Sequence, residues 1–177
     1  RKAVKGQPKR EWSLRPEVLL HPNIPKMLHG VAPREILGAT WWNKTRQEAY
    51  ASTDFHCVAC GTHKSLVSGS RKHLEAHELY EIDYAKGRSK YIEAIPLCPY
   101  CHSYIHDGRL RSLVQLGKMH ASKLIAVIQW GDMVLKRAGL VKQTHQQREE
   151  HFVTMVLNRQ VAAWADWRLV LNGKLYK

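Results

Sequence analysis

The sequence predicts an α+β fold in which a ββα unit framed by cysteines lies between a basic N-terminal arm and a mainly helical C-terminal extension. Three observations support this prediction. All four cysteines fall into two Cys-x2-Cys pairs, at 57–60 and 98–101. Proline and glycine interrupt residues 1–40, which disfavours long regular elements there. Apolar residues recur at helical spacing after residue 108. The predicted division is therefore 1–40, 41–108 and 109–177.

The charge of the chain points to its class of partner. Lys and Arg total 28 against 15 Asp and Glu, for a formal net charge of +13. Such an excess favours nucleic acid, with a merely solvated basic surface as the alternative. No apolar run approaches the roughly 20 residues that cross a bilayer, and no signal peptide is evident. We expect a cytoplasmic protein without a membrane partner.

The two cysteine pairs are the strongest chemical signal. Tetrahedral zinc takes four ligands, and each Cys-x2-Cys turn supplies two thiolates at a suitable separation. Gly61 directly follows the first pair, as a tight turn requires. A reducing compartment disfavours disulfides, and the pairing of every cysteine disfavours free thiols. We predict a structural Zn²⁺ bound by Cys57, Cys60, Cys98 and Cys101.

Three histidines accompany the second pair. His102 and His106 lie one turn apart if residues 99–106 are helical. Two imidazoles at this spacing can bind one metal ion, separate from the cysteine site, which already has four ligands. His77 lies upstream in 74–78, the predicted first strand of a hairpin whose second strand is 91–97. In the resulting ββα unit, His77 faces the helix histidines.

The remaining elements are predicted from apolar spacing, caps and breakers. Thr144 and Gln147 form a candidate capping box for the last helix, and Gly139 is a candidate helix stop. Helices are expected near 33–37 and at 43–51, 109–116, 121–138 and 144–164. A short strand and turn are expected at 167–176.

The order Cys-x2-Cys, Leu-Glu-Ala-His-Glu, Leu-Cys-x2-Cys-His-x3-His resembles the HNH, or ββα-metal, nuclease family in its four-cysteine, bacterial or phage form. The resemblance covers about residues 55–107. It implies a ββα-metal core and a metal-dependent endonuclease that hydrolyses DNA, with double-stranded DNA as its partner. It also implies one catalytic divalent ion besides the zinc, and it leaves monomer and dimer open.

The resemblance further implies individual roles. His102 and His106 match the metal-binding pair of the helix, and His77 matches a strand position that holds a metal ligand or the water-activating base. In one register His77 binds metal and Glu78 is the base; in the other His77 is the base. Glu93 falls near the family's middle asparagine, where a carboxylate would orient an imidazole. The candidate catalytic residues are therefore His77, Glu78, His102 and Glu93.

The donor set bears on the metal, and the basic residues bear on the substrate. Histidine ligands suit Mn²⁺, Ni²⁺ or Zn²⁺, whereas Mg²⁺ prefers the oxygens that nearby glutamates would add. Candidate phosphate contacts, with an ordinary solvated turn as the alternative, are Lys86, Arg88, Lys90, Arg109 and Arg111. The rival functions are a zinc-stabilised DNA-binding module with an inactive site and a protein in which zinc only holds the fold. The second rival leaves the three histidines unexplained.

Overall fold

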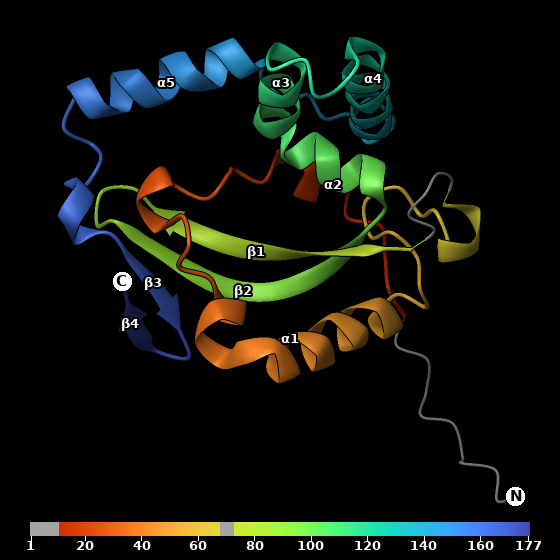
Figure 1. Cartoon of the computed structure of the whole chain (residues 1–177), viewed down its shortest axis with the longest axis horizontal. Helices are drawn as coiled ribbons and strands as arrows, with labels where there is room; N and C mark the ends of the chain where they lie inside the picture. The colour runs from red at the N-terminus through yellow and green to blue at the C-terminus, as the bar shows by residue number, and fades with distance from the viewer. Residues whose placement is uncertain (1–10, 68–72) are drawn as a thin grey trace, which may run out of the picture.

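The computed structural model of the chain describes residues 11–67 and 73–177. A four-stranded sheet with the order β1-β2-β3-β4 forms its centre (Figure 1). β1 (Glu75–Asp83) and β2 (Arg88–Leu97) form an antiparallel hairpin. β3 (Arg168–Leu171) runs parallel to β2, and β4 (Lys174–Tyr176) runs antiparallel to β3.

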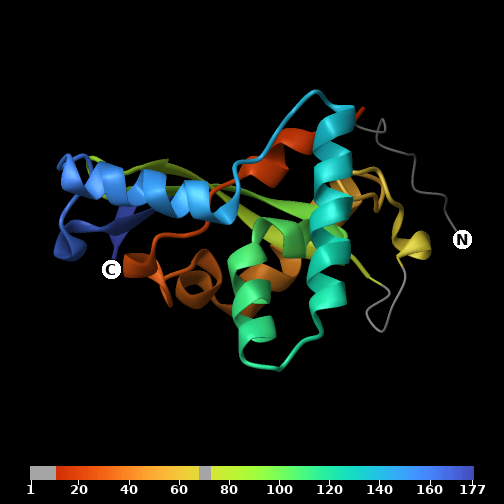
Figure 2. The same ribbon diagram turned by 90° about the horizontal axis from the view of Figure 1, so that it is seen from above.

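Helices cover both faces of this sheet (Figure 1). α1 (Pro33–Ser52) contacts the hairpin from one side, and α2 (Pro99–Ile105) contacts it from the other. α3 (Asp107–Gln115) and α4 (Ala121–Arg137) pack beside α2. Figure 2 shows α5 (His145–Leu157) extending from these helices toward the C-terminal strands. The short 3-10 helices are η1 (Pro16–Leu20), η2 (Lys26–Leu28), η3 (Lys64–Leu66) and η4 (Trp164–Asp166).

Local sequence signals explain where the helices begin and bend. Pro33 and Pro99 occupy the first turns of α1 and α2, where a missing N–H costs nothing. Gly38 adopts a φ of 81°, so it kinks α1 between the two predicted helical segments. The Thr144–Gln147 capping box starts α5 as predicted. Because α1 runs from Pro33 to Ser52, the predicted boundary at residue 40 falls inside this helix, just after the kink.

One hydrophobic core joins the three predicted regions. Leu19 of η1 is fully buried, and it belongs to the same cluster as Leu97 of β2 and Leu135 of α4. The N-terminal arm and the C-terminal helices therefore pack on the central unit as parts of one core. The predicted boundary at residue 108 also falls inside a helix, α3.

The strands are longer than predicted, and the last helix is shorter. β2 begins at Arg88, so two of the candidate phosphate contacts, Arg88 and Lys90, belong to a strand. α5 ends at Leu157, well before residue 164, and the predicted terminal strand and turn form β3 and β4. Among the described residues, the helices are too short or too polar to cross a membrane.

Candidate metal centres

The four cysteines come together between the end of α1 and the start of α2. Their sulfurs all lie within 4.8 Å of one another, and the Cys60 and Cys98 sulfurs are 3.8 Å apart. A disulfide would require about 2.05 Å. Tetrahedral zinc with bonds of about 2.3 Å places its sulfur ligands about 3.8 Å apart. The cluster is thus compatible with a structural metal such as zinc, as the cysteine spacing predicted.

Backbone hydrogen bonds shape both cysteine turns. Gly61 donates its N–H to the Cys57 carbonyl at 2.9 Å and adopts a φ of 76°. The Cys98 sulfur caps α2 by accepting the N–H of Cys101. Val58 donates to the Pro96 carbonyl of β2 at 2.9 Å, which links the first turn to the strand leading into the second. The cysteine cluster therefore holds the start of α2 against the hairpin.

The ionisation of the four thiols is coupled. The hydrogen bond with Cys101 lowers the pKa of the Cys60 thiol, and the hydrogen bonds with Cys57 and Cys60 raise the pKa of Cys101. Once some thiolates form, the remaining thiols hold their protons, because four adjacent negative charges repel one another. A divalent cation removes this restriction by neutralising the sulfurs.

A second group of possible ligands consists of His77, His102 and His106. One ring nitrogen from each lies within 4.8 Å of the others, and His77 Nδ1 is 3.3 Å from His106 Nε2. Nitrogen ligands at about 2.0–2.1 Å from a tetrahedral ion lie about 3.3 Å apart. The structure thus brings together the three histidines predicted as metal ligands, from β1 and from the C-terminal end of α2.

Each of these histidines has a polar partner at its other ring nitrogen. Glu75 Oε2 lies 2.7 Å from His102 Nδ1. Asn23 Oδ1 lies 3.2 Å from His106 Nδ1, and His21 Nδ1 lies 3.2 Å from His77 Nε2. Metal-binding histidines in proteins commonly have such partners, which fix the ring and its tautomer. The nitrogens left to face the centre are Nε2 of His102, Nε2 of His106 and Nδ1 of His77.

The surroundings of His77 and His106 keep both imidazole rings uncharged. Burial, followed by the nearby His106 charge, lowers the pKa of His77 to about 2. Burial and the His102 charge lower the pKa of His106 to about 4. Both rings are therefore neutral near pH 7, which is the form that binds metal.

These pKa shifts predict acid sensitivity when the histidines hold no metal. Unfolded histidines bind protons as the pH falls through about 6.5, whereas folded His106 and His77 stay neutral to about 4 and about 2. Protons therefore bind preferentially to the unfolded state and lower the free energy of unfolding. Between about pH 7.5 and about pH 5.5, each of the two histidines should lower it by about 1.4 kcal/mol. Denaturant unfolding at both pH values measures this loss.

The control for this prediction is His77→Gln, because glutamine does not titrate. The variant should lose about 1.4 kcal/mol less than the wild type over the same pH interval. Contributions from the cysteines cancel in the comparison, since both proteins contain them. Identical pH dependence in the two proteins would contradict the depressed pKa of His77.

The two glutamates predicted to be catalytic do not contact this centre. Neighbouring strand residues point to opposite faces, so Glu78 lies on the α1 side of the sheet, away from His77. There it accepts a hydrogen bond from the Tyr80 hydroxyl at 2.8 Å, and burial raises its pKa. Glu93 forms an ion pair with Arg15 at 2.7 Å. The carboxylate that contacts a histidine of the centre is instead Glu75.

The sequence contained a signal for Glu75 but none for His21 or Asn23. Glu75 lies two residues before His77 on one strand, and such residues share a face. His21 and Asn23 have no spacing relation to the other histidines. They reach the centre because the chain between η1 and η2 passes beside β1 and α2, where His21 also contacts the Tyr80 backbone.

The predicted phosphate contacts fall into two regions. Arg109 is exposed on α3 and lies close enough to His106 for its charge to lower that histidine's pKa. Arg111 instead bonds the buried Asp107, which also accepts from Arg148 at 2.6 Å. Arg109 is therefore available beside the histidine centre, whereas Arg111 is paired with Asp107 within α3. Arg148 of α5 links that helix to α3 through the same carboxylate.

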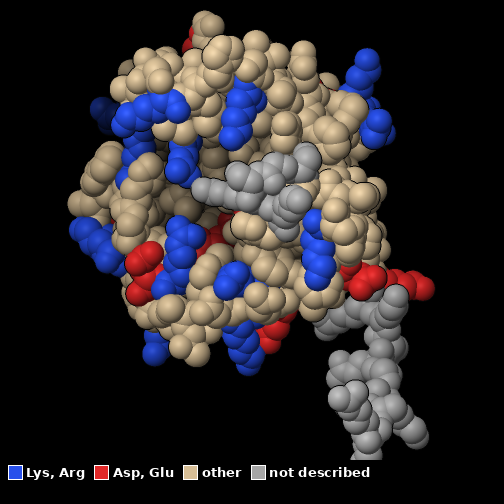
Figure 3. Space-filling model, turned by 45° about the vertical axis from the view of Figure 1, so that its right-hand side comes forward, with Lys and Arg blue, Asp and Glu red and all other residues tan. Residues whose placement is uncertain are grey.

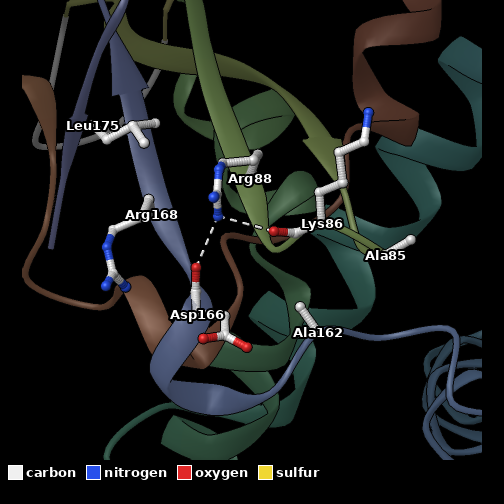
Figure 4. A pocket seen from close by; sticks show the side chains of 7 residues that line it. All are labelled: Ala85, Lys86, Arg88, Ala162, Asp166, Arg168 and Leu175. Carbon is white, nitrogen blue, oxygen red and sulfur yellow. Dashed lines mark hydrogen bonds between the residues drawn. The ribbon is translucent and has the colours of Figure 1, made fainter.

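The other three residues lie toward the turn of the β1–β2 hairpin, away from the histidines. Lys90 is exposed, and Lys86 forms an exposed ion pair with Asp83 at 3.5 Å. Arg88 lines a hollow of about 610 Å³. Figure 4 shows its guanidinium donating to the Asp166 and Lys86 carbonyls. Arg168 lines the same hollow.

Lys and Arg also outnumber Asp and Glu on the face drawn in Figure 3.

No family model, curated protein or solved structure matches this chain.

Proposed function

We propose that this protein is a metal-dependent endonuclease of the HNH, or ββα-metal, type that hydrolyses DNA phosphodiester bonds. The observation that carries the proposal is the convergence of His77, His102 and His106, whose ring nitrogens lie within 4.8 Å of one another. All three belong to a hairpin and the helix that follows it. Each has its second nitrogen occupied by a polar group, which favours a metal site over a chance cluster.

The residues fit one divalent cation with an open coordination position. Three protein ligands are the usual number in a catalytic metal site, where the remaining position takes water or substrate. Such an ion would relieve negative charge on the phosphate and would lower the pKa of a bound water. The all-nitrogen donor set suits Mn²⁺, Ni²⁺ or Zn²⁺ better than Mg²⁺.

Within this proposal His77 is a ligand, not the general base. Its Nδ1 lies 3.3 Å from His106 Nε2, and its Nε2 lies 3.2 Å from His21. Both nitrogens are therefore engaged, and neither is free to take a proton from water. Glu78 has no role as base in this proposal, because it bonds Tyr80 on the other face of the sheet. A cation held by the three histidines would itself have to lower the pKa of the water.

The four cysteines hold a structural Zn²⁺ in this proposal. The ion would fix the beginning of α2 and thereby the positions of His102 and His106 one and two turns further on. The cysteine thiolates are best preserved in a reducing compartment, so we place the protein in the cytoplasm. The resemblance to the HNH family suggests that the cell is bacterial or infected by a phage.

Charge supports DNA as the substrate. The net charge of +13 favours a polyanion. Arg109, beside the histidines, would contact a phosphate near the cleaved bond, and Lys86, Lys90 and Arg168 would contact the backbone further along. Binding should weaken steeply with added salt, since each neutralised phosphate releases a counterion.

One observation favours a second candidate, a zinc-stabilised DNA-binding module with an inactive site. If the three clustered histidines bind the metal through the nitrogens that face the centre, none of them is left to act as a base, and Glu78 lies on the other face of the sheet, where it bonds Tyr80. A chain of this kind would bind metal and DNA without cleaving. Cleavage assays separate the two candidates.

The test is nicking of supercoiled plasmid by the purified protein with Mg²⁺, Mn²⁺, Ni²⁺ or Zn²⁺ added singly. We expect nicking with Mn²⁺ or Ni²⁺, less with Mg²⁺, and none in the presence of a chelator. Absence of nicking with every metal, by protein that is folded and still shifts DNA in a gel, would favour the binding module.

A further inference from the structure

The segment His21–Pro22–Asn23 contacts two of the three clustered histidines, although it lies in the N-terminal arm. We propose that this segment sets the metal affinity of the histidine centre by fixing which ring nitrogens of His77 and His106 face the ion. The inference rests on the metal centre of the proposed function. It assigns His21 and Asn23 as positioning residues that touch neither metal nor substrate.

The contact between His21 and His77 admits two directions of hydrogen bonding. His21 Nε2 lies 2.9 Å from the Tyr80 carbonyl oxygen and 3.0 Å from the Tyr80 nitrogen. A neutral imidazole has one N–H and one acceptor nitrogen. His21 can therefore donate to the carbonyl and accept from His77, or accept from the Tyr80 N–H and donate to His77.

Only the first direction is compatible with metal at His77 Nδ1. When His77 donates from Nε2 to His21, its Nδ1 keeps a lone pair that faces His106 Nε2 at 3.3 Å. In the opposite direction the proton of His77 sits on Nδ1 and points at His106, where the ion would lie. In the first direction, the carbonyl of Tyr80 and the ring of His21 form a chain that holds His77 in its metal-binding tautomer.

Asn23 acts on His106 in the same way. Its side-chain oxygen lies 3.2 Å from His106 Nδ1, and an amide oxygen accepts but never donates. His106 therefore carries its proton on Nδ1 and presents the Nε2 lone pair to the centre. Glu75 does the same for His102 from within β1.

The core holds the segment in place on both sides. Leu19 before it is fully buried, and Leu28 after it is 2% exposed. His77, which His21 contacts, is itself only 5% exposed. A partner anchored in this way is ordered before metal arrives, so little conformational entropy is lost on binding.

The experiment compares His21→Gln with His21→Asn. The Asn side chain ends at the level of Nδ1, so its oxygen can still accept from His77, whereas the Gln amide reaches the level of Nε2 and leaves His77 without its acceptor. Ni²⁺ is titrated by calorimetry into protein that already carries one equivalent of zinc. We expect His21→Gln to bind Ni²⁺ about 10–100-fold more weakly and His21→Asn to stay within about threefold of the wild type.

Controls separate this inference from the proposed function. His29→Gln changes an exposed histidine of the same arm and should leave Ni²⁺ affinity unchanged. Wild-type affinity in His21→Gln would overturn the inference while the metal centre stood. Failure of the wild type to bind Ni²⁺ would overturn the centre and the inference with it. If His21→Gln does not fold, the exposed Asn23→Ala provides the same test: weaker binding supports the role of the segment, and unchanged binding overturns it.

Discussion

Cys98→Ser is expected to lose the structural zinc and to be largely unfolded at room temperature. Structural zinc sites contribute on the order of 10 kcal/mol, which is comparable to the whole stability of a typical domain, about 5–15 kcal/mol. The substitution isolates the metal-binding role of Cys98, because its sulfur is one of four clustered ligands, whereas a serine hydroxyl can still cap α2 in place of that sulfur. Zinc content per chain and thermal unfolding by circular dichroism measure the effect.

Val58→Ala provides the matched control for this prediction. Val58 is 4% exposed and lies in the turn between Cys57 and Cys60, so its truncation perturbs the same region without removing a sulfur. We expect the variant to be destabilised by no more than a few kcal/mol and to keep its zinc. A zinc-free wild type that is folded, or a stable Cys98→Ser, would show that the cluster does not hold a structural ion.

His106→Ala is expected to reduce plasmid nicking by about 10³-fold or more. The substitution removes one of three ligands, and the electrostatic contribution of a catalytic metal is several kcal/mol, or about 10³-fold in rate. DNA binding should persist in a gel-shift assay, because the basic side chains are unchanged. Initial nicking rates at saturating Mn²⁺ or Ni²⁺ provide the measurement.

His151→Ala serves as the control, because His151 is an exposed histidine of α5. It should nick like the wild type when prepared in the same way. Loss of nicking in His106→Ala from an identical preparation would exclude a contaminating nuclease. Retention of the Cys-bound zinc in His106→Ala would show that the fold is intact. Wild-type nicking by His106→Ala would place the active centre elsewhere in the chain.

The local parts of the candidate site could be predicted from the sequence. The two cysteines of each pair are separated by two residues, and His102 and His106 are separated by three. In both cases a single turn of backbone determines how the two ligands lie relative to each other. The capping box at Thr144 is equally local, and the structure contains it. Such features depend on bonds between near neighbours, so their spacing alone specifies them.

The alternation of side chains along a strand could have shown which glutamate lies beside the histidines. Glu78 follows His77 directly in β1, so the two side chains must point to opposite faces. Glu75, two residues before His77, shares its face and meets His102 at 2.7 Å. One register of the resemblance made Glu78 the base, whereas the alternation of side chains along a strand places Glu75 beside the histidines.

Only the tertiary structure decided what completes the centre and how the regions join. His21 and Asn23 lie 56 and 83 positions from the histidines they contact. An apolar stripe on a helix indicates that one face is buried, but it does not indicate which element covers that face. The sequence therefore predicted the arm and the helical extension as separate regions, whereas in the structure they share one core with the central unit. The sequence by itself determined the ligand pairs, because short-range backbone geometry sets them. The path of the chain determined their polar partners, because those contacts depend on how the whole core packs.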